Sequence, residues 1–159
     1  MRAARNEVKK TMTVEKNGEG TYRSAGEIEA LVRGFEDGSL AASEFNHREH
    51  LLVALWYLRQ SPTLEAAGER MRAGLLRFLE HHKENPQIYH ETITLFWLKR
   101  VRSFLDAHKS ERSLVALCNA MFECCGTSRV INHYYSKELR ATDEARSAWV
   151  NPDLQPLDF

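Results

Sequence analysis

One stretch constrains the fold of this 159-residue chain more than any other, the helix predicted to begin at His47. Asn46 is a good N-cap, and Glu49, three residues later, completes a capping-box pattern. The residues that follow are apolar nearly all round the helix: Leu51, Leu52, Ala54, Leu55 and Leu58. A helix that is apolar on every side needs packing partners on every side. The sequence therefore predicts an all-α bundle with this helix at its centre.

Apolar residues recur at helical spacing in four further stretches, and no stretch alternates as a strand would. These stretches cover 25–37, from Ser61-Pro62 to about His81, from about 90 to 105, and from Ser110-Glu111 to 125. The charged residues of the helix that ends at His81, Arg72 among them, are assigned to a solvated face. After Gly126 the pattern weakens to a short helix near 130–135 and short turns capped by Ser136 or Thr142. We predict a single-domain bundle of five or six helices.

The two ends of the chain do not show this pattern. Residues 1–22 mix charge with Thr, Asn and Gly and show no apolar period, which predicts a disordered tail before a helical domain over 23–159. Residues 151–159 contain Pro152 and Pro156, which excludes a regular helix. Apolar residues interspersed in this region, namely Trp149, Leu154, Leu157 and Phe159, predict an irregular tail that docks on the bundle surface.

Composition gives no indication of nucleic-acid or membrane partners. The chain has 22 basic and 22 acidic residues, so no overall field favours a polyanion. Its longest apolar run, 51–58, is far shorter than the roughly 20 residues that span a bilayer. The basic N-terminus lacks the apolar stretch of a secretory signal, which favours a cytoplasmic location.

The three cysteines lie in one short region and are odd in number, which predicts free thiols. Cys118 and Cys125 share a helical face. They are either thiolate ligands of a metal or, more simply, small packing residues.

Three histidines form the candidate site. His47 and His50 are three residues apart, so they share one face of a helix start. A second helix start, Tyr89-His90-Glu91-Thr92, places His90 on the same face as Ile93 and Trp97. Imidazole is the commonest nitrogen ligand of first-row metals. We therefore hypothesise that the two helix starts meet around Zn or Fe held by His47, His50 and His90.

Two carboxylates are candidates for the accompanying chemistry. Glu91 is the nearest one, as a ligand or as a general base on metal-bound water, and Glu49 is the alternative. On a helical wheel Glu91 points about 100° away from His90. A role in orienting an imidazole through its other nitrogen is therefore also open for either carboxylate.

Candidate substrate contacts come from tyrosine, threonine and arginine side chains: Tyr57, Tyr89, Thr94, Tyr134 and Arg146. In the C-terminal part, the guanidinium groups of Arg129, Arg140 and Arg146 lie near Tyr134 and Tyr135 in the sequence, and such groups suit a carboxylate or phosphate. The alternative is that the tyrosines pack the C-terminal tail and Arg146 pairs with Asp153 or with a helix C-terminus.

Two hypotheses for function follow. In the first, the protein is a small metalloprotein, a metal-dependent hydrolase or an oxygen-using enzyme. In the second, it is a non-enzymatic module whose groove between the two helix starts takes a small molecule or a partner helix. The histidines are then neutral, buried and hydrogen-bonded to neighbouring hydroxyls: Tyr57, Tyr89, Thr92 or Thr94.

Several motifs over residues 40–157 resemble those of bacterial all-helical proteins of unassigned function. They are Phe45-Asn46-His47-Arg48-Glu49-His50, Tyr89-His90-Glu91-Thr92, Tyr134-Tyr135-Ser136-Lys137-Glu138, Ala145-Arg146, Trp149 and Pro152-Asp153-Leu154. The chain is also similar in general design to the DinB-like metal-binding bundles, which gather three histidines from different helices. It departs from them by its early H-x-x-H and by lacking a late H-x-x-x-H. The resemblance implies a helical bundle and brings no reaction with it.

Overall fold

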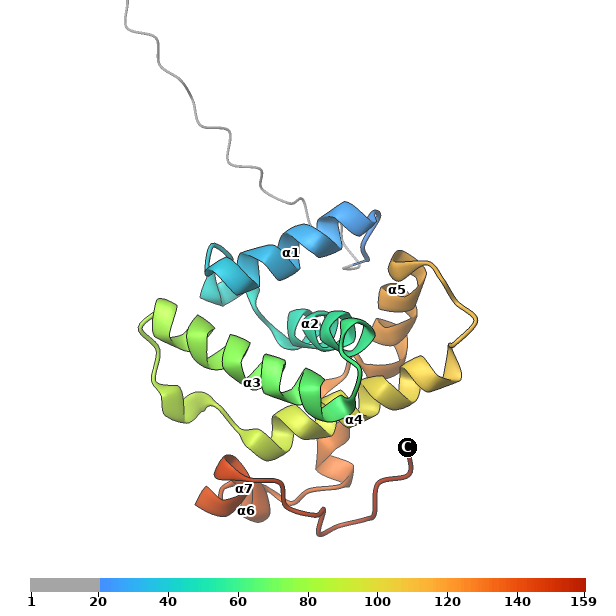
Figure 1. Cartoon of the computed structure of the whole chain (residues 1–159). Helices are drawn as coiled ribbons and strands as arrows, with labels where there is room; N and C mark the ends of the chain where they lie inside the picture. Colours follow the sequence, from blue (N-terminus) through green and yellow to red (C-terminus); the bar gives the residue numbers. More distant parts are fainter. Residues whose placement is uncertain (1–20) are drawn as a thin grey trace, which may run out of the picture.

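A central helix is surrounded by the other long helices in the computed structural model, which describes residues 21–159 (Figure 1). The long helices are α1 (Ala25–Asp37), α2 (His47–Gln60), α3 (Leu64–His81), α4 (Glu91–Ala107) and α5 (Leu114–Cys125). The α2 helix contacts each of the other four, and Leu51 to Val53 are fully buried. No strand occurs in the described part of the chain. The predicted all-α single domain with a central helix is confirmed.

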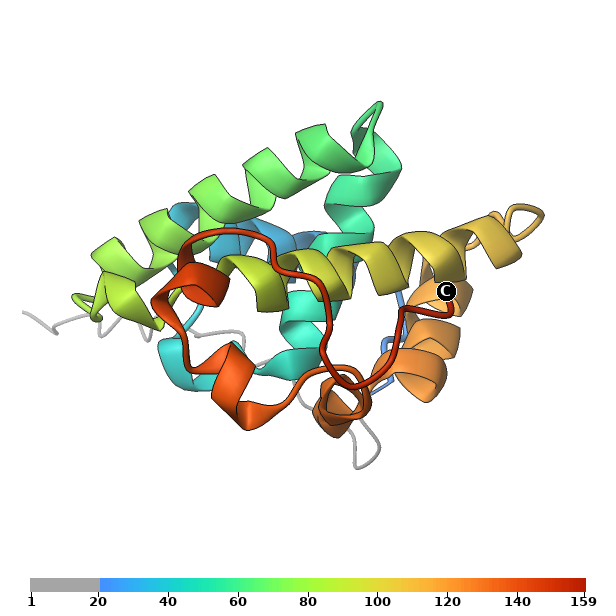
Figure 2. The ribbon, with the colours of Figure 1, turned by 90° about the horizontal axis from the view of Figure 1, so that it is seen from below.

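A second, smaller core lies on the outer side of α4. It is formed by Phe96 of α4 and three residues of the C-terminal part: Ile131, Tyr134 and Tyr135. This part consists of a 3-10 helix, η3 (Ser128–His133), and two short helices, α6 (Lys137–Arg140) and α7 (Asp143–Ser147). The final residues are irregular, as predicted, and run along α4 (Figure 2).

Polar contacts fix this C-terminal part on the bundle. The Thr92 hydroxyl of α4 donates to the Ala148 carbonyl at 2.7 Å and accepts from the Val150 N–H at 3.2 Å. Because these contacts join residues far apart in the sequence, the C-terminal part can contribute side chains to a site beside α4.

Two predicted helix starts are wrong by a few residues. Ser61 is the C-cap of α2, since its N–H donates to the Tyr57 carbonyl, and Thr63 caps α3 by accepting from the Ala66 N–H at 3.1 Å. Likewise α5 is capped by Ser113, not by Ser110. In both cases a second hydroxyl residue lies two or three positions further on, and the structure uses the later one. The first helix matches its prediction, 25–37.

Most of the predicted disordered tail, 1–22, lies outside the described residues. Tyr22, which is described, is hydrogen-bonded through its N–H to Asn119 Oδ1 at 3.0 Å, and Asn119 Nδ2 donates to the Tyr22 carbonyl at 3.1 Å. The last residue of the predicted tail is therefore attached to α5.

The cysteines are free thiols, as predicted. Burial raises the pKa of Cys118 and of Cys125 to about 12, which suits packing residues. Within residues 21–159, every helix is too short or too polar to cross a bilayer.

Close packing of α1 against α3 gives a stability prediction. A Cβ added at Gly74 would lie 2.9 Å from the ring of Phe35, which is buried and cannot move aside. We expect Gly74→Ala to lower the free energy of unfolding by about 2 kcal/mol in denaturant titrations. Gly68→Ala is the control, because its nearest contact is 3.4 Å and alanine favours a helix by about 1 kcal/mol. Equal effects at the two sites would contradict the prediction.

Candidate functional site

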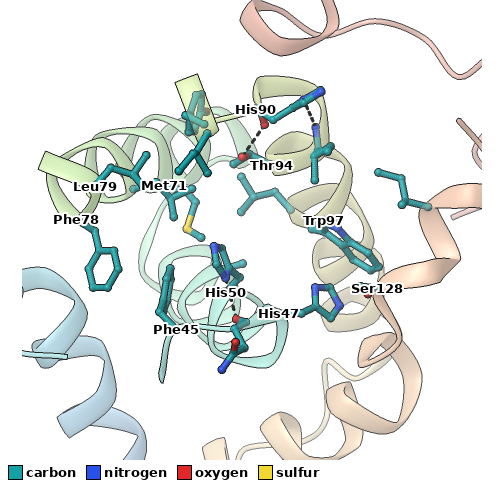
Figure 3. Close-up of a pocket in the computed structure, with 18 of the residues that line it drawn as sticks. Phe45, His47, His50, Met71, Phe78, Leu79, His90, Thr94, Trp97 and Ser128 are labelled. Carbon is teal, nitrogen blue, oxygen red and sulfur yellow. Dashed lines mark hydrogen bonds between the residues drawn. The ribbon is translucent and has the colours of Figure 1, made fainter. Parts of the chain in front are cut away.

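A pocket of about 850 Å³ lies between the starts of α2 and α4, the side of α3, and η3 (Figure 3). This volume is within the range of small-molecule sites. Its walls are largely apolar, with Phe45, Met71, Leu75, Phe78 and Leu79 among them. All three predicted histidines, His47, His50 and His90, also line it. The structure thus brings the two helix starts together around one cavity.

His50 presents an unpartnered nitrogen in this pocket. Its Nδ1 lies 2.8 Å from the carbonyl oxygen of Asn46, and its ring stacks on Phe45 at 4.0 Å between centroids. A carbonyl oxygen only accepts, so Nδ1 carries the hydrogen and Nε2 carries the lone pair. No described residue donates to this Nε2. In Figure 3 the ring projects from α2 toward Met71, so the lone pair is available to an occupant of the pocket.

His90 has both ring nitrogens engaged with the backbone. It is the N-cap of α4, where its Nδ1 accepts from the Ile93 N–H at 3.3 Å. Its Nε2 lies 2.9 Å from the carbonyl oxygen of Arg140 and therefore donates to it. The ring connects the start of α4 to α6 and has no lone pair left for a ligand.

His47 has a third, separate partner. Its Nε2 lies 3.1 Å from the Cys125 carbonyl oxygen, at the end of α5, and therefore donates. The ring lies edge-on to Trp97 at 4.4 Å between centroids. The partners of the three rings are thus backbone groups, and not the tyrosine and threonine hydroxyls that the non-metal hypothesis predicts.

Electrostatics favour the neutral form of the three rings. Burial lowers the pKa of His47, His50 and His90 below the usual value of 6.5, although hydrogen bonds to carbonyls partly offset it. No group of three or more His, Cys, Asp or Glu side chains among residues 21–159 is arranged to hold a metal ion. The Zn or Fe site stays a prediction.

The predicted catalytic carboxylates lie outside the pocket lining. Glu91 is bound by the Arg72 guanidinium, whose Nε lies 3.0 Å from Oε2, and by the Tyr89 hydroxyl at 2.5 Å. Burial would raise the pKa of Glu91, but these hydrogen bonds outweigh it and the pKa is lowered. Glu49 accepts from the Asn46 N–H at 3.0 Å, the predicted capping contact. Both carboxylates hold helix starts in place.

Of the five predicted substrate contacts, two line the pocket and three do not. Tyr89 and Thr94 line the pocket, but their hydroxyls donate to Glu91 and to the His90 carbonyl. The other three lie elsewhere. Tyr57 donates to Glu36, Tyr134 donates to Asp158, and Arg146 donates to the Gln87 carbonyl.

Four polar lining residues come from the C-terminal part: Ser128, Arg129, Asn132 and Arg140. The sequence indicated the two arginines as candidate anion-binding residues, but it did not indicate Ser128 or Asn132 and did not place any of the four beside the histidines. They belong to η3 and α6, where the apolar period is weak. No local pattern connects them with the histidines, because the chain brings them to the pocket by folding back across α4.

Comparisons with protein-family models, with curated proteins and with solved structures find no match to this chain. The resemblance to bacterial helical proteins therefore stays a prediction, and function is inferred from the pocket.

Proposed function

We propose that this protein binds a small apolar molecule carrying a hydrogen-bond donor, and that the donor is received by His50. The observation that carries this proposal is the unpartnered Nε2 of His50 in a largely apolar pocket. A hydrogen bond from a ligand hydroxyl or N–H to this nitrogen would contribute about 0.5–1.5 kcal/mol. The apolar part of the ligand would leave water and pack against the surface around Phe45 and Met71.

The rest of the lining supports a preformed site. The rings of His47 and His90 are held by backbone carbonyls, and the Thr94 hydroxyl is held by the His90 carbonyl. Polar groups that are already satisfied keep their positions when a ligand enters. Of the three rings, those of His47 and His50 each keep one nitrogen with a lone pair, and the His50 ring is the one that projects toward Met71 on the apolar side of the pocket (Figure 3).

A metal-dependent reaction needs more ligands than these rings offer without rearrangement. Catalytic zinc takes about three protein ligands. His90 uses both nitrogens on the backbone, which leaves Nδ1 of His47 and Nε2 of His50. Ligand binding needs only the second of these nitrogens, so we prefer it to the metal-dependent enzyme.

A small molecule also suits the surface better than a partner helix. The exposed large apolar residues among 21–159 are Leu76, Ile88 and Leu154, on three separate elements. A helix-binding groove presents a continuous apolar strip. Ile88 alone of these three lines the pocket.

Binding of N-phenyl-1-naphthylamine tests the proposal, because this neutral probe is apolar, carries one N–H and fluoresces when it leaves water. We expect saturable binding of one probe per chain. His50→Phe keeps an aromatic ring on Phe45 but removes the acceptor, so affinity should fall about tenfold, the equivalent of one hydrogen bond. The measurement is a fluorescence titration.

His108→Phe is a closely matched control. The His108 Nδ1 also lies 2.8 Å from a carbonyl oxygen four residues earlier, and its ring stacks on Phe104 at 4.1 Å, but it is exposed and outside the pocket. This variant should bind the probe as the natural protein does. Absence of saturable binding by the natural protein, or equal losses in both variants, would refute the proposal.

A further inference from the structure

The polar and apolar residues of the pocket lie on different elements. The side of α3 contributes four apolar side chains: Met71, Leu75, Phe78 and Leu79. The lining from η3 and α6 is mainly polar: Ser128, Arg129, Asn132 and Arg140, with Ile131. In Figure 3, His50 lies between Met71 on one side and Ser128 on the other. An occupant of this pocket meets an apolar end, then the His50 acceptor, then a polar end.

The polar end carries positive charge. Arg140 is partly engaged, since its Nη2 donates to Asn132 at 2.7 Å and its Nε donates to the Ser136 carbonyl at 3.3 Å. Arg129 forms no hydrogen bond or ion pair with any residue of 21–159, and it is exposed. The acidic lining residue, Glu84, follows α3 and so belongs to the opposite end. A negative group is therefore favoured at the η3 end.

We infer that the ligand is an amphipathic organic acid whose carboxylate binds Arg129 and whose apolar part lies against α3. The inference rests on the binding function proposed above and names its ligand class. A guanidinium donates two parallel hydrogen bonds to a carboxylate. Arg140 already donates to Asn132 and to the Ser136 carbonyl, so Arg129 is the guanidinium whose paired donors are available, and they match the two oxygens of a carboxylate. The donor received by His50 lies between the two ends of the ligand.

Displacement of N-phenyl-1-naphthylamine from the full chain by decanoate and by 1-decanol tests this inference, since the two competitors share one alkyl length and differ in charge. We expect decanoate to bind about fivefold more tightly than decanol at low salt, where an exposed guanidinium is least screened. Arg129→Gln should remove that preference by weakening the binding of decanoate and leaving the binding of 1-decanol unchanged. Arg129→Lys, which keeps the charge, should retain part of it.

Arg112→Gln is the control, an exposed arginine in the loop between α4 and α5 and outside the pocket. This variant should bind decanoate and 1-decanol with the affinities of the natural protein. The inference is overturned when decanol competes as well as decanoate, when Arg129→Gln weakens both alike, or when Arg112→Gln reproduces the effect of Arg129→Gln. Failure of the naphthylamine probe itself to bind is a different result, which refutes the proposed function and this inference together.

Discussion

We expect Arg72→Met to lower the free energy of unfolding by about 3 kcal/mol, because it leaves a buried carboxylate without its cation. The Glu91 side chain is 7% exposed, and Arg72 is its ion-pair partner. Arg72 itself is half exposed, so the loss should fall at the lower end of the range for a buried pair. Methionine keeps much of the length of the stem, which limits the change in packing. Urea titrations at neutral pH measure the effect.

Arg70→Met is the matched control on the same helix. Arg70 lies 3.9 Å from Glu36, and both side chains are 41% exposed, so its loss should cost about 1 kcal/mol or less. In the Arg72→Met protein the deficit should shrink as the pH falls, because Glu91 can then take up a proton. A loss no greater than that of Arg70→Met would show that the Glu91 pair contributes little.

The role of Glu91 shows where reading the sequence succeeded and where it failed. Its helical-wheel angle pointed away from His90, and the structure indeed directs its carboxylate to α3. Its partner Arg72, 19 residues earlier, was assigned to a solvated face, and half of its side chain is exposed. The Arg72–Glu91 pair could not be predicted from the sequence, because the pair depends on how α3 packs beside the start of α4. Long-range polar pairs of this kind leave no periodic signal.

The helices themselves were predictable because burial imposes a period of 3.6 residues on each of them. The pocket was predictable only in part. The H-x-x-H motif and the His90 helix start indicated which elements meet. The hydrogen on the His47 ring, however, is placed by the Cys125 carbonyl, 78 residues away, and that on the His90 ring by the Arg140 carbonyl, 50 residues away. Any residue type supplies a backbone carbonyl, so its position as a partner cannot be read from side chains.

Mild acid is expected to destabilise the protein through the same three rings. In the folded chain the pKa values of His47, His50 and His90 lie below the usual 6.5, and in the unfolded chain they return to it. The unfolded state then binds more protons, so stability is complete above about pH 6.5 and is lost as the pH falls toward the folded values. If all three rings were fully buried, the free energy of unfolding would fall by at most about 4 kcal/mol between about pH 7 and pH 5.5. Because His47 and His50 are only partly buried, we expect about 2–3 kcal/mol.

Thermal or urea unfolding across this pH window measures the loss, and two comparisons identify its source. His50→Phe removes one titrating ring, so its stability should fall less steeply with acid, whereas His108→Phe should follow the natural protein. A chelator at about pH 7.5 should leave the unfolding curve unchanged if the ring hydrogens are held by carbonyls, while a metal bound by the rings would make that curve sensitive to chelation. A stability that stays flat down to about pH 5.5 would contradict neutral rings in the folded state. The lone pair on Nε2 of His50, which is the acceptor offered to a ligand, depends on that neutrality. Affinity for the naphthylamine probe should therefore decline only where the folded ring takes up a proton, which is at a lower pH than that at which acid begins to destabilise the fold.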